Sequence, residues 1–161
     1  MVIQQELLVK EYKNNCILVS TIDHAKSLAP RLREADLNEL KAHGLDSVEN
    51  ALISGVRDST ECYTVWNKEI DKPIAIFGSG DMEDVGYVWM LGSNDIKRIR
   101  YEFIRHCKDW LAKLLERYSI VYNVIDVRNK VHMRWLKFMG FEFGSNIEIN
   151  GYSFKQFWKV K

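Results

Sequence analysis

The stretch from Val121 to Phe141, VYNVIDVRNKVHMRWLKFMGF, decides the fold of this chain. β-Branched and aromatic residues dominate residues 121–127, which predicts a strand. Asn129 then forms a polar joint and can cap a short basic amphipathic helix over residues 130–139. Gly140 should end that helix, because glycine readily adopts a left-handed C-cap.

The segments on either side extend this unit. Residues 141–149 and 152–160 read as two strands joined at Asn150-Gly151, the strongest short-range hairpin signal in the chain. Upstream, apolar side chains recur at intervals of three or four residues, which predicts one long helix of about six turns. That helical face consists of Ile96, Ile99, Phe103, Cys107, Trp110 and Leu114.

The first half of the chain predicts a meander preceded by short helices. Strands are expected over residues 61–66, 73–77 and 86–91, with a turn at Gly78–Asp81 between the last two. An opening strand is expected from Cys16. Short helices should cover residues 24–28, capped by Thr21 or Asp23, and residues 35–44. A further helix should start at Asp46, which has capping-box spacing to Glu49.

The length and composition of the chain limit the class of protein to which it can belong. The 161 residues suffice for one domain over 1–161, and 47% hydrophobic residues fit a packed core. Three widely spaced cysteines predict reduced thiols, and the histidines lack the spacing of a zinc site, so no metal is expected. No apolar run is long enough for a membrane span, and the N-terminus lacks the pattern of a signal peptide. We therefore expect a cytoplasmic protein that does not contact a membrane.

Charge is unevenly distributed. Residues 97–137 contain 11 basic and 4 acidic side chains, a net charge of +7. Such a patch suits a polyanionic ligand, or it is simply the solvated surface of two helices. Nucleic acid is the less favoured ligand, since no recognised nucleic-acid motif accompanies the patch.

The loop from Gly92 to Asp95 is a candidate anion site. It precedes the long helix, whose N-terminal N–H groups and partial positive charge attract anions. Lys97 and Arg98 add full charges within the first turns. The alternative is that Ser93 or Asp95 only caps the helix.

The order of these elements resembles that of GNAT-type N-acetyltransferases: a meander, a pyrophosphate loop, a long helix, a strand, a short helix and a hairpin. The closing motif matches at Asn129, Gly140 and Phe141. Over about residues 20–160, the chain is more specifically similar to small GNAT-like proteins of podovirus-type tailed phages. That likeness lies in Arg33–Gly44, Ile74–Gly78, Val88–Gly92 with Asp95–Arg98, and Asn129–Phe141.

The resemblance implies an α/β fold with a central mixed sheet and helices on both faces. It also implies acetyl-CoA as cofactor, with its pantetheine arm in the opening between two splayed strands. Carried over position by position, the expected cofactor-binding residues are Trp89, Met90, Leu91, Gly92, Ser93, Lys97, Arg98 and Asn129.

Three departures from the family pattern concern cofactor binding and catalysis. The segment Gly92–Arg98 differs from the family's usual pyrophosphate loop, which reads Arg/Gln-x-x-Gly-x-Gly/Ala. Leu136 stands where the family commonly has a tyrosine that protonates the leaving thiolate, and the strand over residues 86–91 lacks a carboxylate base. The nearest acid–base candidates by element order are Glu83, Tyr87 and Tyr122. His132 is either a further base or a surface histidine.

The resemblance and its departures lead us to expect one of two functions. The first is transfer of acetyl from acetyl-CoA to a primary amine of a host or phage protein or peptide. The second is a catalytically degenerate GNAT-fold protein that acts in virion morphogenesis or in host interaction, located in the host cytoplasm or packaged in the virion.

Overall fold

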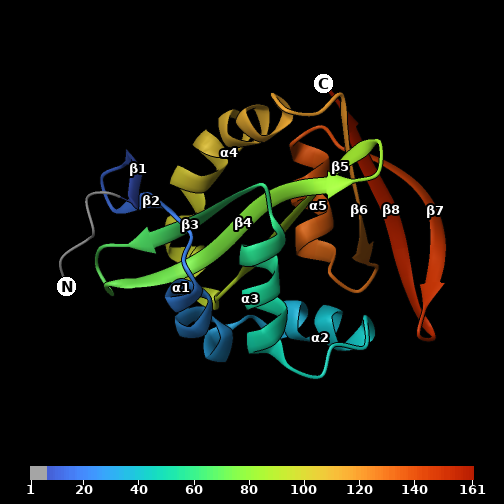
Figure 1. Ribbon diagram of the computed structural model, residues 1–161, viewed down its shortest axis with the longest axis horizontal. Coiled ribbons are helices and arrows are strands. Elements are labelled where there is room, and N and C mark those ends of the chain that lie inside the picture. The colour runs from blue at the N-terminus through green and yellow to red at the C-terminus, as the bar shows by residue number, and fades with distance from the viewer. Residues whose placement is uncertain (1–6) are drawn as a thin grey trace.

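An eight-stranded mixed sheet runs through the computed structural model, which describes residues 7–161 (Figure 1). The strand order is β1-β2-β3-β4-β5-β6-β8-β7, antiparallel except for the β5–β6 pair. The strands are β1 (Leu8–Glu11), β2 (Asn15–Val19), β3 (Glu61–Asn67), β4 (Lys72–Met82), β5 (Val85–Gly92), β6 (Ile120–Asp126), β7 (Glu142–Ile149) and β8 (Tyr152–Val160).

Helices cover both faces of this sheet. They are α1 (Ile22–Leu28), α2 (Glu34–Ala42), α3 (Val48–Asp58), α4 (Arg100–Leu115) and α5 (Lys130–Phe138), with short 3-10 turns η2 (Ala29–Arg31) and η3 (Asn94–Ile99). In Figure 1, α1, α2 and α3 gather along the lower side of the molecule and α4 lies along the upper side. The predicted α/β class with a mixed sheet is therefore confirmed.

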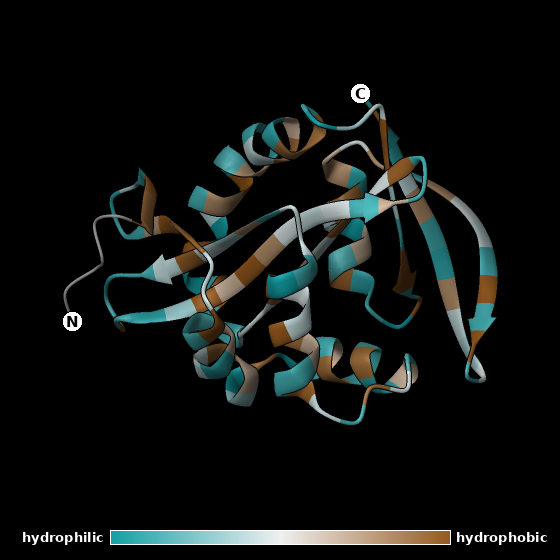
Figure 2. Cartoon of the chain, in the orientation of Figure 1, coloured by the Kyte–Doolittle hydropathy of each residue, from teal (hydrophilic) through white to brown (hydrophobic). Residues whose placement is uncertain are grey.

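The hydrophobic core has one part on each face. The α1–α3 side buries Ala25, Leu28, Leu40 and Leu52 against Ile76 and Leu91 of the sheet. The α4–α5 side buries Cys107, Leu111, Leu114 and Leu136 against Ile74, Val88, Val121 and Ile125. β4 contributes to both parts, with Ile74 on the α4–α5 side and Ile76 on the α1–α3 side, and its centre is hydrophobic (Figure 2).

The closing motif folds as its sequence predicts. Asn129 caps α5 by accepting a hydrogen bond from the His132 N–H. Gly140 has a φ of +90°, and the Phe141 N–H donates to the Leu136 carbonyl, which closes a Schellman C-cap. Asn150 and Gly151 both have positive φ, as a two-residue hairpin turn requires.

The expected turn at Gly78–Asp81 is wrong. β4 continues to Met82, and the chain turns at Glu83, whose φ is +51°. Gly78 is needed for close approach between strands, since a Cβ there would lie 2.6 Å from the Glu61 carbonyl oxygen. Gly80 similarly lies against the Tyr87 ring. Both glycines therefore mark crowded strand positions and no bend.

Three further boundaries differ from the predictions. The long helix does not run unbroken, because η3 precedes α4. The N-cap of α3 is Ser47 and not Asp46. β1 is an additional edge strand whose charged, exposed residues gave no signal in the sequence.

No helix within residues 7–161 is long and apolar enough to cross a membrane. The expectation of no signal peptide rests partly on residues 1–6, which lie outside the described part of the chain.

Candidate functional site

The candidate site is the opening between β5 and β6. These parallel strands are in register only at Gly86 with Val121 and at Tyr87 with Tyr122. Beyond these two pairs the strands diverge. A cavity of about 770 Å³ fills the opening and extends to both helical layers, from the α2–α3 connection on one side to α4 and α5 on the other.

Asn123 closes the start of this opening. Its side-chain Nδ2 donates to the Val88 carbonyl at 2.7 Å, and its Oδ1 accepts from the Val124 N–H at 2.8 Å. One side-chain amide therefore joins both strands where their ladder stops.

Helix α2 closes the opposite end, where the carboxyl ends of both strands meet. Asp36 accepts from the Gly92 N–H at 2.9 Å, and Glu39 accepts from the Asp126 N–H at 2.6 Å. Residues three apart lie on the same helix face, so one turn of α2 reaches both strands. Asp36 is fully buried and forms a two-point ion pair with the Arg33 guanidinium, at 2.8 and 3.2 Å.

Glu39 also has an unusual acidity. Burial is the main cause that raises its pKa to about 7, and the hydrogen bond from Asp126 only partly offsets this. Because its carboxyl lines the cavity and titrates near neutral pH, it can hold or accept a proton there.

The cavity walls are mainly apolar, with a few polar atoms that have no partner. Aromatic lining residues are Tyr12, Phe77, Tyr87, Trp89, Phe103, Trp110, Trp135, Phe141 and Phe157. Among the described lining side chains, four atoms are buried without a hydrogen-bond partner: Asn15 Nδ2, Glu102 Oε1, His132 Nδ1 and Trp135 Nε1. Burial lowers the pKa of His132 to about 4, so its imidazole is neutral at physiological pH.

The charged lining residues are all acidic. Glu39, Asp46 and Glu102 line the cavity, whereas no lysine or arginine in residues 7–161 does. The cavity therefore favours an apolar occupant that is neutral or positively charged.

The loop after β5 is closed by its own hydrogen bonds. The Ser93 N–H donates to the Ile74 carbonyl, and Ser93 Oγ accepts from the Asp95 N–H at 3.2 Å. The Ile96 N–H donates to the Ser93 carbonyl. With Gly92 held by Asp36, the N–H groups of Gly92, Ser93, Asp95 and Ile96 are all used within the protein.

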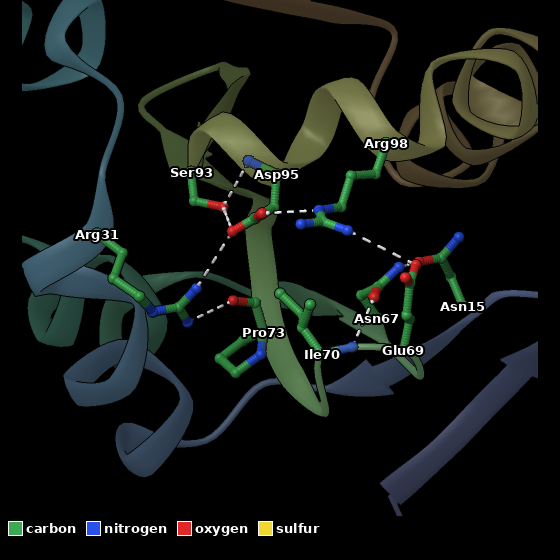
Figure 3. Close-up of polar contacts among 9 residues, drawn as sticks. All are labelled: Asn15, Arg31, Asn67, Glu69, Ile70, Pro73, Ser93, Asp95 and Arg98. Carbon is green, nitrogen blue, oxygen red and sulfur yellow. Dashed lines mark hydrogen bonds and ion pairs between the residues drawn. The ribbon is translucent and has the colours of Figure 1, made fainter.

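An internal carboxylate also sits at this helix start (Figure 3). Asp95 lies 3.0 Å from Arg98 Nε and 3.8 Å from Arg31 NH1, and Arg98 reaches Glu69 at 3.7 Å. A pyrophosphate needs free N–H donors and unpaired cations. The residues present therefore do not fit a pyrophosphate unless these contacts are first exchanged.

The residues predicted to bind a cofactor fall into three places. Trp89, Met90 and Leu91 line the cavity, and the Trp89 indole is anchored to Ser59 Oγ at 2.8 Å. Gly92 and Ser93 lie in the closed loop, and Lys97 and Arg98 lie in η3 directly after it. Asn129 is buried and borders a separate cavity of about 220 Å³.

The residues predicted as acid–base groups are not brought together. Glu83 is exposed at the β4–β5 turn and does not line the cavity. Tyr87 does line it, whereas the Tyr122 hydroxyl donates to Gln156 at 3.1 Å. His132, which was either a base or a surface residue, has its Nδ1 buried.

The residues that shape the opening were not singled out from the sequence. Asp36 and Glu39 lie in the segment Arg33–Gly44 that carries the family likeness, and Asn123 lies in the predicted strand, but none of them was given a role. A polar residue within the run VYNVID was the one available signal.

Solved structures of GNAT acetyltransferases share this fold. A GNAT-family acetyltransferase from Bacillus anthracis superposes with a TM-score of 0.67 at 7% identity, covering 94% of this chain and 97% of that one. The ribosomal-protein-S5-alanine acetyltransferase from Vibrio fischeri gives 0.64 at 12%, covering 93% and 94%. The aminoglycoside acetyltransferase AAC(6')-Ib in complex with coenzyme A gives 0.63 at 12%, covering 91% and 95%. At these identities the likeness establishes the GNAT fold, as expected from the sequence.

Comparison by sequence, unlike comparison by structure, does not point to an acetyltransferase. A search of curated proteins found no match. One family model, described as "Bacteriophage T7, probable scaffold protein Gp13", matches residues 64–147. This match spans more than half of the 161 residues and includes the meander, the closed loop, α4, the splayed strands and α5. The chain therefore belongs to this phage T7 Gp13 family.

Proposed function

We propose that this chain is a phage assembly protein that uses a GNAT fold to bind a partner protein and not to transfer acetyl groups. The observation that carries the proposal is the closed loop after β5. The N–H groups of Gly92, Ser93, Asp95 and Ile96 already donate to groups of the protein, and Asp95 forms an ion pair with Arg98. The family description as a probable scaffold protein supports the same role.

The retained opening between β5 and β6 gives such a protein a specific binding surface. The fold keeps the apolar cavity but surrounds it with carboxylates, while the basic residues of 97–137 lie outside it. Phosphate groups are disfavoured inside such a cavity, whereas an apolar protein segment is not. The expected place of action is the host cytoplasm during particle assembly, and packaging in the virion is the alternative.

Acetyl transfer to a primary amine of a host or phage protein is the second candidate. It is favoured by Glu39, whose pKa of about 7 at the cavity wall suits a general base. Acetyl-CoA would supply the acetyl group as a thioester. Trp89, Met90 and Leu91 would lie beside it. Lys97 would serve its phosphates directly, and Arg98 only after release from Asp95 and Glu69.

Complementation of a phage lacking this gene separates the two functions. Wild-type protein, Glu39→Gln and Lys97→Glu/Arg98→Glu would be supplied in trans, and infectious yield and particle composition measured. Glu39→Gln keeps an acceptor for the Asp126 N–H but removes the titratable group. Acetyl transfer predicts failure of both variants, because one removes the base and the other the cations for the phosphates. The assembly role predicts rescue by Lys97→Glu/Arg98→Glu, because neither residue lines the cavity.

Failure of both variants, with normal amounts of folded protein, would favour the enzyme. Particles of normal yield and composition without any copy of the gene would contradict the assembly role.

A further inference from the structure

We propose that the opening between β5 and β6 receives an extended, apolar segment of a partner protein that carries a lysine or arginine and pairs with the backbone of Met90. The inference rests on the assembly role proposed above and specifies the chemistry of the partner.

On the side of β5 that faces β6, the backbone N–H and C=O of Met90 have no strand partner. In an antiparallel ladder, alternate residues direct their N–H and C=O groups to the same side. Ser93 bonds to β4 through Ile74, so Gly92, Met90 and Val88 direct theirs away from β4.

The neighbours of Met90 confirm this alternation. Gly92 bonds to Arg33 and Asp36, and the Val88 carbonyl bonds to Asn123. Met90 stands between them, and no residue of β6 is in register with it.

The backbone of β6 offers a matching acceptor. Lys161 donates to Ser119 and Val127 donates to Ser153, so odd-numbered residues of β6 bond to β8. Val124 and Asp126 therefore face the opening. The N–H groups of both are taken, by Asn123 and Glu39, but the Val124 carbonyl has no β5 partner in register.

The spacing suits a short extended segment. From Val88 to Gly92 a strand advances roughly 13 Å, at about 3.3 Å per residue, which accommodates about three residues. Such a segment can exchange two hydrogen bonds with Met90, as in strand addition to an open sheet edge. A small apolar amine would leave these backbone groups unmatched.

The charge of the cavity selects the side chain of the segment. Glu102 has a buried carboxylate oxygen without a partner, and His132 beside the same cavity is neutral. With only carboxylates among the charged lining residues, a lysine or arginine is the complementary group. The aromatic residues of the cavity wall would contact the apolar side chains of the segment.

The test uses the purified full-length protein and a displayed library of random eight-residue peptides. Selected peptides should be apolar with one lysine or arginine. The tightest would be synthesised with free ends blocked, in three forms: unchanged, with alternate backbone amides N-methylated, and with its basic residue replaced by glutamate. Calorimetry should show about tenfold or greater weakening for both altered forms.

Protein variants locate the site. Glu102→Gln should weaken binding of the unchanged peptide by about tenfold. Glu61→Gln is the matched control, because Glu61 also has a buried carboxylate oxygen without a partner but does not line the cavity. Its affinity should equal that of the wild type.

Three results would overturn the inference: no peptide enriched over an immobilised unrelated protein, equal binding of the N-methylated peptide, or equal losses for Glu102→Gln and Glu61→Gln. Complementation is measured separately in the phage. Failed peptide binding with intact complementation would remove this inference and leave the assembly role, whereas normal particles without the gene would remove the role itself.

Discussion

The loop after β5 and the opening beside β5 differ sharply, although both adjoin the same strand. In the loop, N–H donors and charges are satisfied by nearby residues such as Ser93 and Asp95. In the opening, Met90 of β5 and Val124 of β6 lack partners on each other's strand, and Glu102 Oε1 lacks a hydrogen bond. In folded proteins nearly all buried polar groups are paired. The contrast supports the proposal that this protein binds a partner in the opening and not at the loop.

The largest expected effect comes from breaking the α2 closure. Asp36→Ala should destabilise the protein by about 3–5 kcal/mol, because the largely buried Arg33 loses its counter-charge and the Gly92 N–H its acceptor. Urea denaturation followed by circular dichroism measures this. Asp58→Ala removes an exposed ion pair with Arg57 and should change stability by less than about 1 kcal/mol. Similar small losses in both would show that the α2 closure contributes little.

The pH dependence of protein stability tests whether Glu39 is buried in the opening. The folded state raises the pKa of Glu39 from 4.5 to about 7, so its favourable contribution is present at low pH and is lost as pH rises through 7. Relative to wild type, Glu39→Gln should therefore gain stability between pH 4.5 and 7, by at most about 3 kcal/mol.

His132 should show the opposite dependence. Its pKa falls from 6.5 to about 4 in the folded state, so the wild type loses stability as pH falls through this range. His132→Gln should gain stability relative to wild type towards low pH. Denaturation curves measured between pH 4 and 8 test both variants, and parallel profiles for all three proteins would contradict the assigned burial.

A smaller effect is expected at the start of the opening. Asn123→Ala removes the bonds to Val88 and Val124 and should cost about 1–2 kcal/mol. It should also speed amide hydrogen exchange at Val124, which loses its acceptor. Asn146→Ala, which removes an exposed contact with Lys155, is the control and should change neither quantity. Unchanged exchange at Val124 would mean that Asn123 does not hold the two strands.

The smallest change in stability is expected in the loop. Asp95→Asn should cost less than about 1 kcal/mol, because its ion pairs are partly exposed. Its effect on ligand binding should be larger, since Arg31 and Arg98 lose their internal anion. Inorganic pyrophosphate titrated at low salt should bind the variant more tightly than the wild type. Equal affinity would show that Asp95 does not occupy the anion position.

The sequence predicted most of the fold because its signals were local. Asn129 and Gly140 cap α5 through their own neighbours, and Asn150-Gly151 sets its turn without distant help. The turn expected at Gly78–Asp81 failed for the opposite reason. A side chain at Gly78 would collide with the Glu61 backbone on another strand, and no pattern in the neighbouring sequence reveals this contact.

The candidate site was harder to predict because its residues act across the sequence. Asp36 bonds to Gly92 and Glu39 to Asp126, contacts that exist only once the sheet has formed. The cations Lys97 and Arg98 were visible in the sequence, but the engagement of Arg98 by Asp95 and Glu69 was not. Which of the predicted cofactor and acid–base residues act in function stays a prediction.

The most direct test of the central claim is titration of the wild-type protein with acetyl-CoA by calorimetry at low salt, beside Lys97→Glu/Arg98→Glu. The N–H groups of the loop and the Arg98 side chain are already bonded within the protein, and the charged residues of the cavity are acidic. We therefore expect no binding of acetyl-CoA in the micromolar range for either protein. Micromolar binding to the wild type that the double variant abolishes would contradict it and would restore the loop as a cofactor site.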